Sequence, residues 1–178
     1  EEFKRLCTEL DTKFKEAYKD TPPPLRTYGT AITAIATNNY GALPTRNFQA
    51  GTFEGADKIN GEALTSKFLV QPKACFSCPI ACGRLTKVEE PGYEGSGEGP
   101  EYETIYAFGS NCGIDNLAAI TKANYICNEL GLDTITMGAT IACAMELAER
   151  GWLPESHIGR ALGFGDAKAI VELTRMTG

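Results

Sequence analysis

Three cysteines lie within eight residues of one another in the segment CFSCPIACGR (75–84). Cys75, Cys78 and Cys82 have the spacing C-x2-C-x3-C, and the proline and glycine in the segment prevent it from continuing as a helix. Three close cysteines and one distant cysteine are typical of proteins that hold an iron–sulfur cluster through thiolate ligands. Zinc sites usually combine two C-x2-C pairs or include histidines. His157 is the only histidine, so zinc is the weaker interpretation, and buried cysteines without a ligand role are the other alternative.

The sequence does not fix the fourth ligand. Cys112, Cys127 and Cys143 fall in helical patterns, where free cysteine is expected to be a core residue. Either one of them turns toward the segment, or the fourth ligand lies outside the 178 residues. Arg84 ends the segment and is able to donate to a cluster sulfur or to a phosphate. A surface salt bridge of Arg84 is the equal alternative.

Two carboxylates stand at the start of a predicted helix in GPEYET (99–104). Glu101 and Glu103 are two residues apart and do not share a helix face, so at most one of them points at a cofactor. The other glutamate offsets the helix dipole. The alternative is that both glutamates have only this structural role.

The segment NELGLD (128–133) predicts a turn between two helices. One helix ends at Gly131 and the next begins near Asp133. Such a turn leaves acceptors and backbone groups free to bind a heterocycle that carries several N–H donors. The alternative is a plain helix–turn–helix in which the aspartate only caps the second helix.

The hydrophobic pattern predicts a mainly α, multihelical domain. Apolar residues at a spacing of three and four predict an amphipathic helix over 2–19, which three prolines end. In the loop over 41–52, Arg46 and Asn47 are expected to lock the backbone. The other expected elements are helices at about 30–39, 55–68 (interrupted by Gly61), 101–112, 116–131, 133–151 and 166–176, a mobile connector over 91–100, and a single short strand over 84–90.

Composition limits the classes of partner and compartment. The chain has a net charge of −6, which argues against nucleic acid and against an anionic membrane. No apolar run approaches the roughly 20 residues that span a bilayer. The seven cysteines are an odd number and no export signal precedes them, so reduced thiols and a cytoplasmic location are expected, with a disulfide framework as the weaker alternative. The lack of an initiator methionine suggests a fragment of a larger protein.

Taken together, six segments resemble the tungsten-containing aldehyde ferredoxin oxidoreductases. No single segment is specific, but their order and spacing are. The resemblance implies an enzyme that oxidises aldehydes to carboxylic acids, with ferredoxin as electron acceptor, a tungsten (or molybdenum) bis-pterin cofactor and a [4Fe–4S] cluster. The six segments are YGT (28–30), GALPTRNF (41–48), CFSCPIACGR (75–84), GPEYET (99–104), NELGLDTIT (128–136) and AMELAERG (144–151).

The resemblance also implies the ligands of the cluster and a catalytic glutamate. Cys75, Cys78 and Cys82 match the family segment that supplies three cluster ligands, while the fourth cysteine comes from a far helical domain that is absent here. A glutamate near the tungsten takes or gives a proton in the family, and Glu103 is preferred over Glu101 for this role. The histidine that partners this glutamate lies further along the family's chain.

A pterin-binding motif, D-x-x-G-L-C/D, has its counterpart in residues 128–133. The resemblance implies that Asn128, Leu132 and Asp133 contact a pterin, with Arg84 as a further cofactor-binding candidate. Asn128 stands where the family has aspartate. This exchange keeps an acceptor oxygen but loses a charge.

By this resemblance, residues 1–178 are one multihelical domain of a larger enzyme, without its N-terminal β-rich pterin domain and its last helical domain. The expected partners are ferredoxin, a small aldehyde and the remaining domains. The isolated chain is expected to be inactive and can be free of cofactor. A homodimer stays open, although no histidine is in place for the family's dimer metal. The alternative function is a non-catalytic helical module for electron transfer or assembly that binds an iron–sulfur cluster or zinc.

Overall fold

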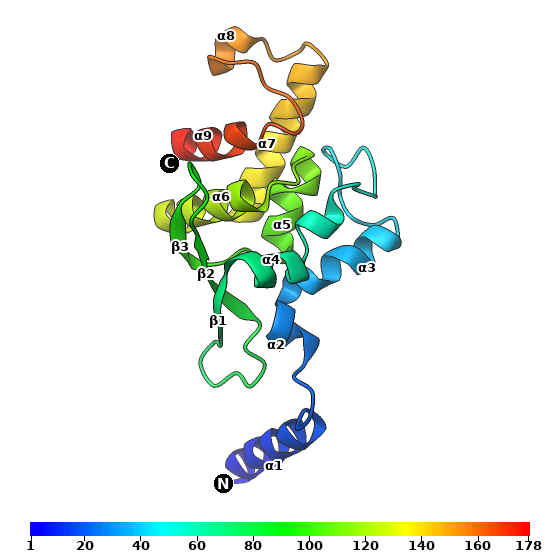
Figure 1. Cartoon of the computed structure of the whole chain (residues 1–178), viewed down its shortest axis with the longest axis vertical. Coiled ribbons are helices and arrows are strands. Elements are labelled where there is room, and N and C mark those ends of the chain that lie inside the picture. The colour runs from blue at the N-terminus through cyan, green and yellow to red at the C-terminus, as the bar shows by residue number, and fades with distance from the viewer.

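Helices make up most of the structure, a computed structural model that describes all 178 residues (Figure 1), and the mainly α fold class is confirmed. The α-helices are α1 (Glu2–Ala17), α2 (Pro24–Tyr28), α3 (Thr33–Asn39), α4 (Gly61–Phe68), α5 (Tyr102–Phe108), α6 (Leu117–Leu130), α7 (Thr134–Glu149), α8 (Glu155–Ile158) and α9 (Ala167–Thr177). Short 3-10 helices are η1 (Thr30–Ile32), η2 (Ala56–Lys58) and η3 (Ser110–Cys112). The strands are β1 (Leu69–Lys73), β2 (Gly83–Val88) and β3 (Gly95–Glu98).

The centre of the core lies between α5, α6 and α7. Ile105, Ile120 and Met145, one from each helix, are fully buried, and burying such side chains is the main driving force of folding. Helix α7 approaches α5 so closely that a Cβ atom at Gly138 would lie 2.7 Å from the backbone carbon of Ala107. Helix α9 packs against α6 on the side away from the sheet.

The caps predicted from the sequence are present at the central helices. Asn116 accepts a hydrogen bond from the backbone of Ala119 at 3.0 Å, which caps α6. Gly131 ends this helix with a φ of +70°, a backbone conformation that glycine adopts without steric cost. The predicted helix over 101–112 is shorter than expected, because it breaks at Gly109 before η3.

The sheet is larger than the sequence predicts. Strand β2 confirms the expected strand, but β1 and β3 pair with it in the antiparallel order β1-β2-β3. The connector expected over 91–100 is therefore wrong in part. Strand β1 contains Pro72 and β3 contains two glycines, residues that are rare in strands and weaken the local signal. Both are edge strands, held by their neighbour rather than by their own propensity.

Two other segments show how local sequence sets the backbone. The predicted helix over 55–68 begins at Gly61 instead of being interrupted there, because Asn60 caps it by accepting from Ala63 at 2.8 Å. In the loop over 41–52, the side-chain amide of Asn47 donates to the carboxylate of Glu146 at 2.6 Å. The backbone N–H of Arg46 donates to the backbone carbonyl of Ser110 at 3.0 Å. The expected locking of this loop is confirmed.

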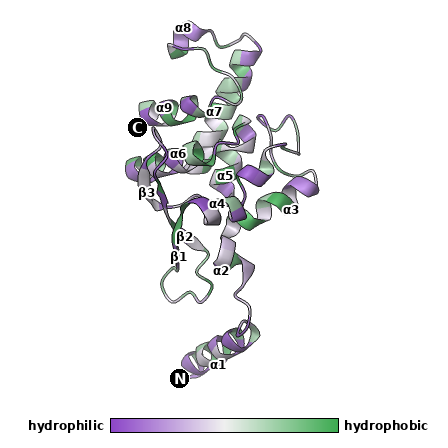
Figure 2. Ribbon diagram, in the orientation of Figure 1, coloured by the Kyte–Doolittle hydropathy of each residue, from purple (hydrophilic) through white to green (hydrophobic).

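Helix α1 stands away from the rest of the molecule (Figure 1). It is amphipathic, as predicted, with hydrophobic and hydrophilic positions side by side in Figure 2, but none of its residues is buried. Phe3, for example, is 77% exposed. None of the helices combines the length and the apolar composition that crossing a bilayer requires.

Candidate functional site

The three clustered cysteines lie on one loop, residues 74–82, which connects β1 to β2 and extends beyond one end of the sheet (Figure 1). We call this segment the cysteine loop. Cys75 is exposed, Cys78 and Cys82 are half-buried, and all three thiols are free. The loop thus presents three thiols at the surface of a folded body.

The backbone of the cysteine loop turns sharply around Cys78. The Cys78 amide donates to the carbonyl of Cys75 at 3.1 Å, and Ser77 and Ala81 each adopt a φ of +57°. The amides of Ile80 and Ala81 point at the Cys78 sulfur and lower the pKa of its thiol. These donors favour the thiolate, which is the form that binds metals.

The three thiols are not drawn together as a finished metal site. No group of three or more His, Cys, Asp or Glu side chains in the chain is arranged to hold a metal ion. The loop faces helix α1 across a groove of about 940 Å³. The residues lining the groove include Phe3, Cys7, Leu10 and Phe14 of α1 and Phe76, Cys78 and Pro79 of the loop.

Arg84 anchors one end of the cysteine loop. It lies at the start of β2, and its side chain is only 1% exposed. Its guanidinium donates to the carbonyl oxygens of Ala81 and Cys82 in the loop, at 3.1 and 3.3 Å. It also donates to three carbonyl oxygens of α2, those of Leu25, Arg26 and Thr27 at 3.1, 2.6 and 2.9 Å. This burial excludes the surface salt bridge that the sequence left open for Arg84.

The two glutamates of GPEYET face different neighbours, as their i, i+2 spacing predicts. Glu101 precedes α5 and accepts a hydrogen bond from the hydroxyl of Thr30. Burial lowers the pKa of Arg84, and the nearby Glu101 carboxylate acts in the opposite direction. Glu101 therefore belongs to the side of α5 that faces Arg84.

Glu103 is exposed on the first turn of α5 and lies near the α6–α7 turn. Burial raises the pKa of Tyr106, and the carboxylate of Glu103, followed by that of Asp133, raises it further. The hydroxyls of Thr104 and Thr134 are 2.8 Å apart and join the beginnings of α5 and α7. The structure thus brings the predicted catalytic glutamate close to the predicted pterin motif.

The α6–α7 turn satisfies most of its own polar groups. Asp133 caps α7 by accepting from the backbone of Thr136 at 2.7 Å, and hydrogen bonds from Thr136 and Ile135 lower the pKa of Asp133. Asn128 is exposed and Leu132 is half-buried. The capping role offered as the alternative for Asp133 is therefore present, and Asn128 leaves its amide group at the surface.

The sequence of this helical body matches a known family model over residues 5–178. The model describes aldehyde ferredoxin oxidoreductase, domains 2 and 3. The chain belongs to the aldehyde ferredoxin oxidoreductase family. The resemblance predicted from the six segments is thereby confirmed, and a helical fold is the one expected for these domains of the family.

Several proteins are similar to the chain. It is 50% identical to a tungsten-containing aldehyde ferredoxin oxidoreductase of Thermococcus kodakarensis over 137 residues, which are 77% of this chain and 22% of that protein. A protein of the same name from Pyrococcus furiosus is 46% identical over 77% of the chain and 22% of its own length. An aliphatic sulfonate oxidoreductase, WOR-like subunit, from Pyrococcus furiosus is 29% identical over 99% of the chain and 28% of its length.

The matched part of the chain spans only about a fifth of the length of its closely similar relatives. Membership of the aldehyde ferredoxin oxidoreductase family supports an oxidoreductase role.

Within this family framework, the predicted site residues fall into two groups. Cys82, Arg84 and Glu101 lie together at the cysteine loop, and Glu103 and Asp133 lie together at the α6–α7 turn. In Figure 1 the cysteine loop extends from one end of the sheet, whereas α6 and α7 lie at the other. The chain alone does not bring the two groups into one cavity.

Sequence reasoning missed two residues that contact the candidates. Tyr106 follows Glu103 by three positions and so shares its helix face, a spacing that was visible in the sequence. Thr30 contacts Glu101 from 71 positions away, and no local signal indicates such a pair.

The cysteines outside the loop are placed differently from one another. Cys112 and Cys127 are buried, as expected, and burial raises the pKa of Cys127 to about 11. Cys143 is exposed, so its predicted core position is wrong: it lies on a face of α7 that no other element covers.

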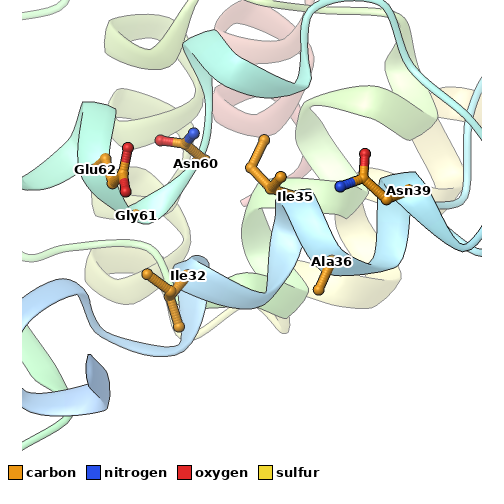
Figure 3. Close-up of a pocket in the computed structure, with 7 residues that line it drawn as sticks. All are labelled: Ile32, Ile35, Ala36, Asn39, Asn60, Gly61 and Glu62. Atoms are coloured by element: carbon orange, nitrogen blue, oxygen red, sulfur yellow. The ribbon is translucent and has the colours of Figure 1, made fainter. Parts of the chain in front are cut away.

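A separate cavity of about 390 Å³ lies between α3 and α4 (Figure 3). None of the candidate site residues lines it. Its lining combines apolar side chains of η1 and α3 with amide and carboxylate groups, namely Ile32, Ile35, Ala36, Asn39, Asn60, Gly61 and Glu62.

Proposed function

We propose that these residues are the cluster-bearing helical domain of an enzyme that oxidises aldehydes to carboxylic acids and transfers the electrons to ferredoxin. The observation that carries the proposal is the family match over residues 5–178, which includes a loop with three free thiols. All seven cysteines are free, which supports a reducing compartment such as the cytoplasm. The remaining domains of the polypeptide are further partners, and the 178 residues alone are expected to be inactive.

The cysteine loop fits a [4Fe–4S] cluster in its donor chemistry. Cys75, Cys78 and Cys82 would hold three irons, and a cysteine from another part of the polypeptide would hold the fourth. A bound cluster supplies one-electron transfer. The amides aimed at the Cys78 sulfur support this role, because hydrogen bonds to cluster sulfurs tune the reduction potential.

The α6–α7 turn is the proposed contact with one pterin of a tungsten (or molybdenum) bis-pterin cofactor. Asn128, Leu132 and Asp133 would bind it, the first through its exposed amide. When bound, that cofactor supplies the two-electron oxidation of the substrate. The capping bond of Asp133 uses one carboxylate oxygen, and a carboxylate has further lone pairs to offer.

Glu103 is the proposed general base and acid. Its carboxylate is exposed beside the turn, whereas the carboxylate of Glu101 is engaged by Thr30. A positioned carboxylate that takes or gives a proton contributes typically about 10²–10⁴-fold to a rate. Tyr106, next to Glu103, is placed to orient that carboxylate.

The test uses the intact polypeptide, purified without oxygen from cells supplied with tungstate. Ferredoxin reduction that depends on added aldehyde is expected, together with iron, acid-labile sulfide and tungsten in the protein. Glu103→Gln should lower kcat by at least about 10²-fold, while the control Glu62→Gln on α4 should not. Iron and sulfide without tungsten or turnover would instead indicate a non-catalytic cluster module. A colourless zinc protein would contradict the proposal altogether.

A further inference from the structure

Arg84 is a charged side chain in an unusual environment. It is among the largest fully buried side chains of the chain, yet it forms no ion pair, because no carboxylate oxygen lies within 4 Å of its guanidinium. An arginine keeps its positive charge in proteins. Its charge is therefore balanced by the dipoles around it and by the nearby carboxylate of Glu101, which is not bonded to it.

The five hydrogen bonds of Arg84 all go to backbone carbonyl oxygens. Two acceptors, those of Ala81 and Cys82, are on the cysteine loop, and the other three are on α2. The guanidinium has five N–H donors in a fixed planar fork. At most one of these donors is not used in the hydrogen bonds to the backbone. Arg84 has little to offer a pterin phosphate directly, and instead ties the loop to the helix.

The neighbouring backbone is shaped around this side chain. A Cβ atom at Gly29 would lie 3.1 Å from Nε of Arg84 and 3.1 Å from the carbonyl oxygen of Cys82. Gly29, which has a φ of +69°, therefore lets the end of α2 approach the loop. Glycine at position 29 is therefore the residue type that the contact with Arg84 requires.

We propose that Arg84 is the positioning residue of the cysteine loop and that its buried charge raises the reduction potential of an iron–sulfur cluster held there. The inference rests on the proposed function for the presence of the cluster. One-electron reduction adds one negative charge to the cluster, and a nearby buried cation stabilises that charge, since such charges are weakly screened. The five backbone bonds keep Cys82 at a fixed place relative to the body of the domain.

Two substitutions separate the charge of Arg84 from its geometry. Arg84→Lys keeps the charge and loses the planar fork, whereas Arg84→Gln loses the charge. Lys87→Gln, an exposed position on the same strand, is the matched control. Each variant of the intact polypeptide is purified without oxygen, and iron and sulfide content, the midpoint potential by EPR-monitored titration, and the rate of iron release to a chelator are measured.

Arg84→Gln is expected to have a more negative potential than wild type, while Arg84→Lys stays near the wild-type value and Lys87→Gln does not change. Arg84→Lys should release iron several-fold faster, because its three donors cannot span five acceptors. A cluster-loaded Arg84→Gln protein with the wild-type potential would overturn the inference. If that variant does not fold, Arg84→Lys decides: iron release at the wild-type rate would overturn the inference. A wild-type protein without a cluster would instead contradict the proposed function.

Discussion

The cysteine loop and the α6–α7 turn carry the two halves of the candidate site, and their polar groups find partners in different ways. In the turn, Asp133 bonds to the helix that follows it directly in the sequence. In the loop, the carbonyl oxygens of Ala81 and Cys82 depend on Arg84, and Arg84 depends in turn on α2, more than fifty positions away in the sequence.

This difference separates local from non-local stabilisation. The turn is stabilised by local bonds. The loss of one of them should therefore lower stability only a little, because the neighbouring helices hold the turn in place. The loop forms a local turn around Cys78, but its attachment to the body of the domain depends on one buried side chain, that of Arg84, and its thiols are left free for a ligand. We therefore expect substitutions to have unequal effects at the two places.

The largest loss of stability is expected for Arg84→Met. The substitution removes five hydrogen bonds and leaves carbonyl oxygens of the loop and of α2 buried without partners, which should lower the free energy of unfolding by about 3 kcal/mol or more. Urea unfolding followed by circular dichroism measures this, with Lys87→Met as control. A loss below that of the control would show that the loop does not depend on Arg84.

A smaller loss of stability is expected when the packing between α5 and α7 is disturbed. Gly138→Ala places a methyl group against Ala107, and overpacking of this kind costs typically about 1–3 kcal/mol. Gly163→Ala is the matched control, because no atom lies within 4 Å of a Cβ at that position. Equal unfolding midpoints in urea for the two variants would contradict the close contact of α5 and α7.

The cap of the turn should give a pH-dependent effect. The pKa of Asp133 is held below its ordinary value of 3.8 by the bonds it accepts. Its carboxylate therefore stabilises the folded state above about pH 4, and this stabilisation is lost as the pH falls through the folded-state pKa. We expect Asp133→Asn to lower the melting temperature at pH 7, with the difference from wild type shrinking below pH 4. If the difference in melting temperature between wild type and Asp133→Asn did not depend on pH, the negative charge of Asp133 would not be the source of the stabilisation.

The smallest effect on stability is expected for the exposed thiol of the loop. Cys75→Ser should change the free energy of unfolding by no more than about 0.5 kcal/mol, since surface substitutions away from special features are nearly neutral. The same exposure should make Cys75 and Cys143 react with iodoacetamide in the folded, cluster-free protein, while Cys112 and Cys127 are protected. Mass spectrometry of the alkylated peptides locates the modified residues, and rapid labelling of Cys112 would contradict the packing of the core.

The contrast between local and distant contacts also explains what the sequence could predict. Helices α6 and α7, their caps at Asn116 and Asp133 and the turn at Gly131 follow from neighbouring residues, and all of them are present, whereas the short helices α2 and α8 were not predicted. Strands β1 and β3 have poor strand propensity and form only because β2 pairs with them. The contact of Thr30 with Glu101 and the burial of Arg84 depend on residues far along the chain, and no spacing rule reveals them.

The candidate site divides in the same way. The spacing of Cys75, Cys78 and Cys82 correctly placed three free thiols on one loop, because short-range turns determine that geometry. The position of Cys143 was wrong because a helical pattern does not show which face a neighbouring element covers. The separation of the cysteine loop from the α6–α7 turn depends on the packing of the whole domain.

The central claim is that the cysteine loop holds an iron–sulfur cluster, and the most direct test is the iron and acid-labile sulfide content of the intact polypeptide purified without oxygen. The account predicts iron and sulfide in nearly equal amounts, with visible absorbance, in wild type and in Cys143→Ser, and a loss of both in Cys78→Ser. A full complement of iron and sulfide in Cys78→Ser, or none in wild type, would contradict it.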